Sequence, residues 1–394
     1  MSGLRLVLIT RRFWPLVGGA EKAMANLAAA LASRGAEVTL LTACWSPDWP
    51  TQVTLRGARV VRLPQSDRRF WGTLDYMRKL GHWLRRHRGQ YDLVYVSMLK
   101  HDAYAALGAA GRRVPVVLRA EGAGATGDCI WQDEARFGWL IRRRCRRAAA
   151  VIAPSAGIYD ELLARGYDAD RVVSLPNGVS IPPLSTMETR LAARRTLVET
   201  QPALDLRSDT PLALFTGRLH PGKGLDRLIA AWKIVVSRHP TARLLLAGEG
   251  PQQMAMARQI EALSLTGHIR LVGAFPEVDE LLAAADLFIL PSYEEGMSLA
   301  LLEAMAAGLP VVASDVAGNR AVLRDGREGL LVPAGQVQTL AAAIERLWDD
   351  RELGARLGRS ARRRVETEFS LAQSIEAHEH LFHRLVSRER IGQS

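Results

Sequence analysis

The stretch PSYEEGMSLALLEAMAAGLP, residues 291–310, decides how the rest of the chain is interpreted. It follows DLFIL (286–290), a short apolar run that predicts a buried parallel strand, and it continues into apolar residues at helical spacing. In an open parallel sheet, ligands bind outside the carboxyl ends of the strands. The order of strand, polar loop and helix therefore predicts a ligand site in the loop between residues 293 and 298.

Two carboxylates belong to this predicted site. Glu295 lies in the loop, and Glu303 follows eight positions later in the predicted helix. Between them Ser298 is a favoured N-cap residue, and the free N–H groups behind an N-cap can hold a phosphate. A phosphate site between two carboxylates that can accept hydrogen bonds from hydroxyl groups favours a nucleotide sugar as the ligand. The alternative is a core helix whose glutamates only complement the helix dipole.

The segment EEGMSLALLEAMAAGLPVVASDVAGN, residues 294–319, resembles the E-x7-E region of the retaining glycosyltransferases of family 4. The resemblance extends over most of the chain, from a Gly-Gly turn near residue 18 to the tail near residue 385. It implies an α/β fold class with two Rossmann-like doubly wound domains that face each other across a cleft, the GT-B fold. It also implies that a sugar is transferred from a nucleotide diphosphate donor with retention of configuration.

Length and element order agree with more than one domain. A chain of 394 residues suggests two domains, and strand-helix-strand patterns begin near residue 4 and again near residue 211. We expect an N-terminal acceptor-binding domain over residues 1–180, a linker region over 181–210, a C-terminal nucleotide-sugar-binding domain over 211–370, and a final helix over 371–394 that crosses back to the first domain.

Two cations follow the first predicted strand of the second half. Arg218 and Lys223 lie in a loop with glycine and proline, just before a predicted helix, and this arrangement suits a pyrophosphate. Solvated surface charge is the alternative. The resemblance implies that Arg218 and Lys223 hold the diphosphate and stabilise the charge of the leaving group. It further implies that Glu303 binds the ribose hydroxyls and that Glu295 orients the sugar, so the expected catalytic residues are Arg218, Lys223 and Glu295.

The resemblance adds backbone contacts to the donor site. The family carries a Gly-Gly-x-Glu loop, here with Gly18 and Gly19, that faces the donor phosphates across the cleft. This turn is not GxGxxG, so a nicotinamide dinucleotide is not expected. The turn from Gly273 to Pro276 corresponds to the family's backbone contact with the nucleobase. The remaining residues expected at the donor are Gly296, Met297, Ser298 and Leu299.

The acceptor side departs from the family pattern. Many members have a histidine near the position of Glu121, which follows a predicted strand and precedes a glycine-rich loop. His101, after the preceding strand, is the nearest histidine. Both Glu121 and His101 are therefore candidates on the acceptor side.

Positive charge is concentrated in the first half. Residues 1–180 contain 27 Lys and Arg against 15 Asp and Glu, whereas residues 181–394 contain 25 against 26. Residues 68–88 alone contain seven Lys and Arg and one acidic residue, which is typical of a helix on an anionic membrane surface. The apolar residues available for one face are Phe70, Trp71, Leu74, Met77 and Trp83. The alternative is a half-exposed helix with its apolar face on the sheet. Nucleic-acid binding is a remote alternative, since no recognition motif is present.

Other features limit the location and the cofactors. No apolar run reaches the ~18 residues of a membrane helix, and Cys44, Cys129 and Cys145 fit neither a disulfide framework nor a metal spacing. We therefore expect a cytoplasmic protein, peripheral on the cytoplasmic face of the membrane if the basic helix binds there. Asp168 and Asp170 form a DxD, the metal motif of a different glycosyltransferase fold, but aspartates favour turns and a polar turn is predicted. No metal and no cofactor besides the nucleotide-sugar co-substrate are expected.

These observations predict a retaining, metal-independent glycosyltransferase that acts on a glycan or lipid-linked acceptor in the synthesis of cell-surface polysaccharide or glycolipid. A nucleotide-sugar epimerase or a phosphorylase of the same fold is the alternative. An epimerase would release an altered sugar without any acceptor, so product analysis distinguishes these reactions.

Overall fold

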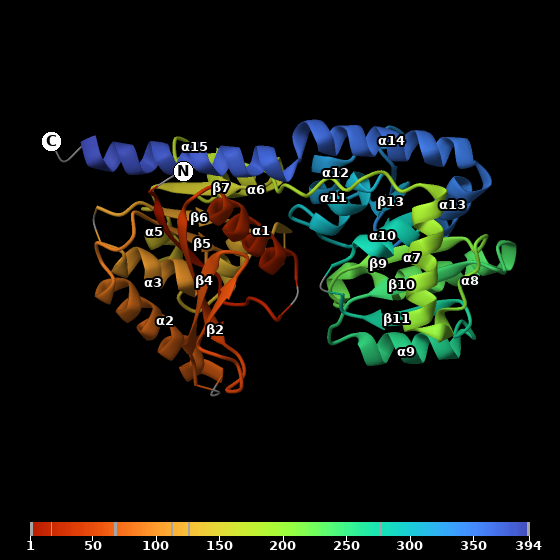
Figure 1. Cartoon of the computed structure of the whole chain (residues 1–394), viewed down its shortest axis with the longest axis horizontal. Helices are drawn as coiled ribbons and strands as arrows, with labels where there is room; N and C mark the ends of the chain where they lie inside the picture. The colour runs from red at the N-terminus through yellow and green to blue at the C-terminus, as the bar shows by residue number, and fades with distance from the viewer. Residues whose placement is uncertain are drawn as a thin grey trace. The chain divides into compact units, whose positions relative to one another are not determined.

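Two compact units make up the chain (Figure 1). This computed structural model describes residues 3–16, 18–66, 69–111, 113–124, 127–275 and 277–391. Unit 1 contains Met1–Asn177 and Ala372–Ser394, and unit 2 contains Gly178–Leu371. Arg68 and Pro276, which belong to two of the predicted segments, lie outside the described residues.

In the part of unit 1 that the structure describes, the sheet has eight strands in the order β3-β4-β2-β1-β5-β6-β7-β8. All neighbouring strands are parallel except β3, which pairs antiparallel with β4. The strands are β1 (Arg5–Ile9), β2 (Glu37–Cys44), β3 (Gln52–Leu55), β4 (Ala58–Pro64), β5 (Leu93–Ser97), β6 (Val116–Arg119), β7 (Ala150–Ala153) and β8 (Val172–Ser174). The chain winds outward from β1 in one direction and then from β5 in the other. The ends of β1 and β5 therefore form the switch point where ligands bind in such sheets.

Seven α-helices belong to the described part of unit 1: α1 (Gly19–Ser33), α2 (Arg69–Arg86), α3 (His101–Ala109), α4 (Asp128–Glu134), α5 (Gly138–Cys145), α6 (Ala156–Ala164) and α15 (Leu371–Ile391). The last of them, α15, packs on unit 1 through His378 and Phe382, whose rings contact that of Tyr95 with centroids 5.9 and 5.8 Å away. The end of the chain is thus part of the first unit.

The basic helix α2 buries residues outside the predicted apolar set, and Trp83 of that set packs half-buried against the core. Tyr76, Leu80 and Leu84 are fully buried, whereas Trp71 and Leu74 are exposed. Spacing of three and four residues fits both faces, and contact with the sheet decides between them. Two large apolar side chains of a basic helix therefore lie on the surface.

The described residues of unit 2 form six strands in the order β11-β10-β9-β12-β13-β14, all of them parallel. They are β9 (Leu212–Thr216), β10 (Arg243–Ala247), β11 (Ile269–Gly273), β12 (Leu287–Leu290), β13 (Val311–Ser314) and β14 (Leu330–Val332). The helices of unit 2 are α7 (Met187–Thr200), α8 (Leu225–Arg238), α9 (Gln253–Ala262), α10 (Asp279–Ala284), α11 (Leu299–Ala306), α12 (Ala317–Val322), α13 (Val337–Asp349) and α14 (Arg351–Glu368). The strand order reverses between β9 and β12. The predicted α/β class with two doubly wound sheets is confirmed.

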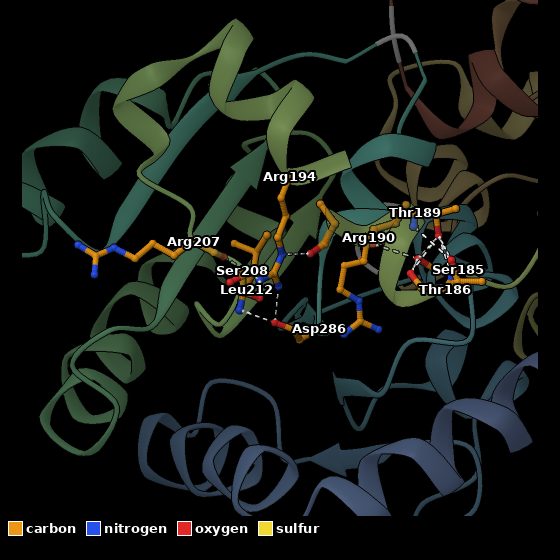
Figure 2. Close-up of polar contacts among 11 residues, drawn as sticks. Ser185, Thr186, Thr189, Arg190, Arg194, Arg207, Ser208, Leu212 and Asp286 are labelled. Atoms are coloured by element: carbon orange, nitrogen blue, oxygen red, sulfur yellow. Dashed lines mark hydrogen bonds and ion pairs between the residues drawn. The ribbon is translucent and has the colours of Figure 1, made fainter. Parts of the chain in front are cut away.

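Residues 181–210, the predicted linker region, contain a helix that is fixed to the sheet of unit 2 by polar contacts (Figure 2). Helix α7 lies in this region, and its buried Arg194 forms an ion pair with Asp286 at 2.8 Å. Asp286 in turn accepts a hydrogen bond of 2.9 Å from the backbone N–H of Leu212, at the start of β9. The carbonyls of Ala284, Arg207 and Ser208 accept the other hydrogen bonds of the Arg194 guanidinium. These contacts fasten α7 to the sheet of unit 2.

Candidate functional site

Two loops meet where the strand order of unit 2 reverses. One follows β9 and the other follows β12, and the N–H of Tyr293 donates to the carbonyl of Gly222 at 2.9 Å. Gly224 has φ +63°, and a Cβ there would lie 2.2 Å from the carbonyl oxygen of Pro291. Only glycine allows this approach without a shift of the backbone. The close contact brings the predicted diphosphate loop against the predicted sugar loop.

Lys223 and Glu295 form an ion pair across these loops. Lys223 Nζ lies 2.6 Å from Glu295 Oε1, and the hydroxyl of Ser292 donates to the same oxygen at 2.7 Å. The Glu295 side chain is only 9% exposed. Gly318, near the start of α12, packs so tightly on the loop that a Cβ there would lie 2.2 Å from the Glu295 carbonyl oxygen. Glu295 is therefore held in place by charge and by packing. The sequence predicted both residues at the site, but not this pairing.

Arg218 lies on the same loop with its side chain in solvent. In the part of the chain that the structure describes, its guanidinium has no hydrogen-bond or ion-pair partner. The backbone around it is fixed, because the N–H of Gly217 donates to Ala247 and that of Leu219 donates to Glu249. A Cβ on Gly248 would lie 1.8 Å from the Gly217 carbonyl oxygen. Arg218 therefore presents an unpaired positive charge from a loop whose backbone is held by hydrogen bonds and close packing.

The start of helix α11 confirms the predicted cap. Ser298 Oγ accepts a hydrogen bond of 3.3 Å from the N–H of Leu301. Gly296 and Leu299 are buried, whereas Met297 and Glu303 are half-buried. Glu303 lies in the second turn of this helix, so the loop, the cap and the glutamate belong to one strand-loop-helix unit.

Gly273 connects to the same group of loops through its backbone. It ends β11 with φ +79°, and its carbonyl accepts from the N–H of Gly248 at 2.7 Å. Gly248 is also the residue that packs on Gly217. The structure therefore links Gly273 to the loop of Arg218 and Lys223.

Gly18 and Gly19 belong to unit 1, at the start of α1. A Cβ on Gly18 would lie 2.3 Å from a carboxylate oxygen of Glu21, whose other oxygen pairs with Arg12 at 3.3 Å. Their role toward donor phosphates stays a prediction.

Glu121 lies just after the end of β6 in a polar cluster. Its Oε1 accepts from Ser97 Oγ at 2.9 Å and from Arg119 Nε at 3.1 Å. Arg119 also donates to the side-chain oxygen of Asn177, the last residue before the chain enters unit 2. Burial raises the pKa of Glu121, and the charge of Arg119 opposes this rise. The cluster holds one oxygen of Glu121 firmly.

His101 begins α3 and contacts Trp131 edge to face, with ring centroids 5.0 Å apart. Burial lowers its pKa, and the nearby charges of Arg11 and Lys100 lower it further. The imidazole is therefore neutral at pH 7. A neutral imidazole can donate one hydrogen bond and accept another. It could therefore accept a hydrogen bond from a hydroxyl group of the acceptor substrate.

The sequence did not predict a cluster of buried polar side chains, Arg11, Tyr76 and Asp102, near the carboxyl ends of β1 and β5. The side chain of Asp102 is buried next to His101, and burial raises its pKa to about 7 against the opposing charge of Arg11. The hydroxyl of Tyr76 and Nε of Arg11 are buried without a hydrogen-bond partner in the described structure. Arg11 lies over the Tyr76 ring, 5.4 Å from its centroid. The feature of the sequence that could have indicated this cluster is Arg11, which follows the first predicted strand at the switch point of the sheet.

Asp168 and Asp170 form a turn, as predicted. The N–H of Asp170 donates to Asp168 Oδ1 at 3.1 Å, and Arg171 pairs with Asp168 at 3.3 Å. The turn precedes β8, so it lies at the amino end of the strands, opposite to Glu121. Over the described ranges, no three His, Cys, Asp or Glu side chains are grouped closely enough to hold a metal ion. Likewise, none of the helices described is both long and apolar enough to cross a membrane.

Two family models match the chain. The model "Glycosyl transferase 4-like domain" matches residues 18–178, and "Glycosyl transferases group 1" matches residues 199–364. The two matches lie almost entirely within unit 1 and unit 2, respectively.

Curated relatives are similar over parts or most of the chain. Glycogen synthase of Mycobacterium tuberculosis is 29% identical over 399 residues, covering 93% of this chain and 91% of the relative. An exopolysaccharide phosphotransferase of Streptomyces coelicolor is 40% identical over 173 residues, or 43% of this chain. The chain spans less than two thirds of the length of three relatives that it matches, with shares of 18%, 44% and 60%.

Solved structures share the whole architecture. Sucrose-phosphate synthase from Thermosynechococcus elongatus superposes with a TM-score of 0.81 at 22% identity, covering 98% of this chain and 100% of that one. HepE of Anabaena, in complex with UDP-glucose, gives a TM-score of 0.76 at 20% identity, covering 97% and 100%. At these identities the likeness shows the fold, and it confirms the predicted GT-B class.

Proposed function

Since the chain belongs to glycosyltransferase family 4, we propose that it moves a sugar from a nucleotide diphosphate-sugar to a glycan or lipid-linked acceptor with retention of configuration. Unit 2 binds the donor and unit 1 binds the acceptor. The observation that carries this proposal is the contact between the Arg218–Lys223 loop and the Glu295 loop at the switch point of unit 2.

Charge at this contact suits a leaving diphosphate. Arg218 is available because it has no partner among the described residues, and Lys223 is oriented by Glu295. As the bond to the sugar breaks, negative charge accumulates on the diphosphate, and fixed positive groups stabilise it. Glu295 accepts hydrogen bonds from hydroxyls of the sugar, and Glu303 accepts those of the ribose.

The donor is a UDP-sugar in this proposal, because a structural neighbour is described in complex with UDP-glucose. Thermal unfolding with UDP, GDP and ADP tests it. A nucleotide at 100 times its dissociation constant adds about 2.7 kcal/mol to the free energy of unfolding. We expect the largest rise in melting temperature with UDP. No rise with any of the three nucleotides would contradict a nucleotide-sugar donor.

The acceptor binds where Arg11 and Tyr76 leave buried polar atoms without a partner among the described residues, near the buried Asp102 and beneath the carboxyl edge of the unit 1 sheet. Buried polar atoms without partners are costly, and the hydroxyls of a sugar would satisfy them. His101 and Glu121 lie on the same edge. Two relatives are named for making glycogen and for acting on exopolysaccharide, and synthesis of a cell-surface polysaccharide or glycolipid is the proposed role.

An epimerase or phosphorylase of the same fold remains the alternative reaction. Incubation of the protein with a labelled UDP-sugar distinguishes the three. A glycosyltransferase forms a product only when an acceptor is added, and an epimerase forms a changed sugar without one. A phosphorylase leaves the UDP-sugar unchanged and instead releases a sugar phosphate from a glycan and inorganic phosphate.

The surface of α2 supports a peripheral position on the cytoplasmic face of a membrane. Trp71, Leu74, Arg78, His82 and Arg85 are exposed and lie at helical spacing along one stripe. Aromatic and aliphatic side chains enter the interface, while basic side chains attract anionic headgroups.

Replacing Arg78, Lys79, Arg85 and Arg86 with glutamine should reduce sedimentation with anionic vesicles. Each basic residue near the surface contributes about 1 kcal/mol of binding free energy. The matched control replaces four exposed arginines of α14, namely Arg351, Arg356, Arg359 and Arg363. If the wild-type protein does not sediment with anionic vesicles at physiological salt, α2 is only a solvated surface and a soluble acceptor is favoured.

Transfer is proposed to be independent of metal, because Arg218 and Lys223 supply the positive charge that a divalent cation would otherwise bring to the diphosphate. The rate in excess EDTA should equal the rate with magnesium. Loss of activity in EDTA and its return with manganese would contradict this mechanism.

A further inference from the structure

A cavity of about 980 Å³ opens on unit 1 at the amino ends of β6, β7 and β8. It lies on the opposite edge of the sheet from Glu121 and Asp102, and the proposed transfer reaction does not use it. Its apolar lining includes Val116, Ala150 and Leu385. Its charged lining comes from three separate segments of the chain: the end of α5, the turn that leads into β8, and the last part of α15.

Among the described residues, five arginines and three acidic residues line this cavity. The arginines are Arg144, Arg147, Arg171, Arg384 and Arg388, and the acids are Asp168, Asp170 and Glu389. The predicted DxD turn thus forms part of the wall. One of its carboxylates, Asp168, pairs with Arg171. The cavity keeps an excess of positive charge.

Two of the guanidinium groups are fixed by their surroundings. Arg144 stacks on the ring of Tyr104, 3.6 Å from its centroid, and donates to the Tyr104 carbonyl at 3.2 Å. Arg171 donates to the carbonyl of Ala148 at 3.2 Å as well as pairing with Asp168. These contacts orient donors at the cavity before any ligand binds, which lowers the entropy lost on binding.

The guanidinium groups of the other three arginines, Arg147, Arg384 and Arg388, have no hydrogen-bond or ion-pair partner anywhere in the described ranges. Arginines near the ends of α5 and α15 complement the helix dipoles, which accounts for Arg147 and Arg388 in part. The dipole does not account for Arg384, a turn earlier in α15, or for Arg171, which precedes a strand. Like charges that converge on one cavity repel each other unless an anion lies between them.

We propose that this cavity binds the phosphate groups of an organic ligand, at a site separate from the donor and acceptor sites. Planar guanidinium groups match phosphate oxygens in pairs, and the apolar lining accommodates the carbon part of the ligand. The phosphate belongs either to a lipid headgroup or to a soluble phosphorylated compound. This proposal does not depend on the proposed transfer reaction.

Calorimetric titration with inorganic pyrophosphate tests the site. Excess UDP is present throughout, so that the loop of Arg218 and Lys223 does not compete for the probe. The test variant is Arg384→Gln with Arg388→Gln, and the matched control is Arg356→Gln with Arg359→Gln on the exposed face of α14. We expect the affinity of the test variant to fall at least about tenfold, since two charge-assisted contacts are lost, and that of the control to stay unchanged. Arg147→Gln should weaken binding in the same direction, which provides a second variant if the first folds poorly.

Vesicles distinguish the two sources of phosphate. Sedimentation with phosphatidylglycerol vesicles that is lost in Arg384→Gln/Arg388→Gln, and that pyrophosphate inhibits, identifies a lipid headgroup. Pyrophosphate binding without any variant-dependent sedimentation identifies a soluble ligand. The proposal is overturned if the wild type binds neither probe, or if the test and control variants lose equal affinity, because the arginines would then act only as general surface charge. If UDP fails to stabilise the protein, that outcome contradicts the proposed donor site. It does not change the comparison of pyrophosphate binding between the test and control variants.

Discussion

Replacement of Lys223 with alanine should lower kcat for sugar transfer by about 10²–10³-fold, the usual effect of removing one group that stabilises charge in a transition state. Lys223 is oriented by Glu295 at 2.6 Å and lies on a loop whose backbone is fixed by Gly224. Its charge is therefore in place before the diphosphate leaves. Steady-state kinetics with a UDP-sugar and an acceptor would measure the effect, with KM and kcat determined separately.

Two further variants separate chemistry from folding. Lys223→Ala leaves the largely buried Glu295 without its cation, so a loss of stability is also expected. Arg218→Ala should lower kcat without that loss, because no described residue pairs with the Arg218 guanidinium. Lys233→Ala, an exposed lysine of α8, is the control. A Lys223→Ala protein that changes only KM would show that the lysine binds ground state and transition state equally, contrary to a catalytic role.

Patterns along the sequence were sufficient for most of the fold. Apolar runs such as 286–290 and 211–217 became β12 and β9, and glycine turns marked the starts of the following helices. The hairpin of β3 and β4 was missed, although Arg56 and Gly57 both have positive φ, the signature of a two-residue hairpin turn. Arginine rarely has such a conformation, so the residue types gave a weaker signal than Asn-Gly would have given.

The sequence predicted which residues belong to the candidate site, but not which of their side chains contact each other. Glu295 and Lys223 are 72 positions apart, and only the contact of two loops in three dimensions shows that they form an ion pair. The same is true of Arg119 and Asn177, which are 58 positions apart. Burial of Asp102 and Tyr76 depends on how α2 and α3 pack together, and the two alternative faces of α2 have similar composition. Side-chain pairing and burial are tertiary properties, so local periodicity does not determine them.

Replacement of Arg119 with methionine should destabilise the protein by about 3–5 kcal/mol, because it leaves a buried carboxylate without its cation. The side chains of Arg119 and Glu121 are 5% and 15% exposed, and Arg119 Nε donates to Glu121 Oε1 at 3.1 Å. Among the described residues, only Ser97 would then remain as a side-chain donor to that oxygen. Denaturant unfolding measures the change. The control is Arg59→Met on β4, an exposed arginine, for which a change within about 0.5 kcal/mol is expected.

The loss in Arg119→Met should depend on pH in a direction that identifies its cause. Burial raises the pKa of Glu121, and removal of the opposing Arg119 charge raises it further in the folded state, while the unfolded state keeps its ordinary value. The folded variant then binds a proton that the unfolded chain does not. Its stability is greatest below the unfolded pKa and falls as the pH rises through the folded one. The variant should therefore be closer to wild type at about pH 5 than at about pH 8, and adding Glu121→Gln should recover part of the loss at pH 8. Equal losses at both pH values, with no recovery in the double variant, would assign the effect to lost packing and to the lost hydrogen bond with Asn177 instead of to the buried carboxylate.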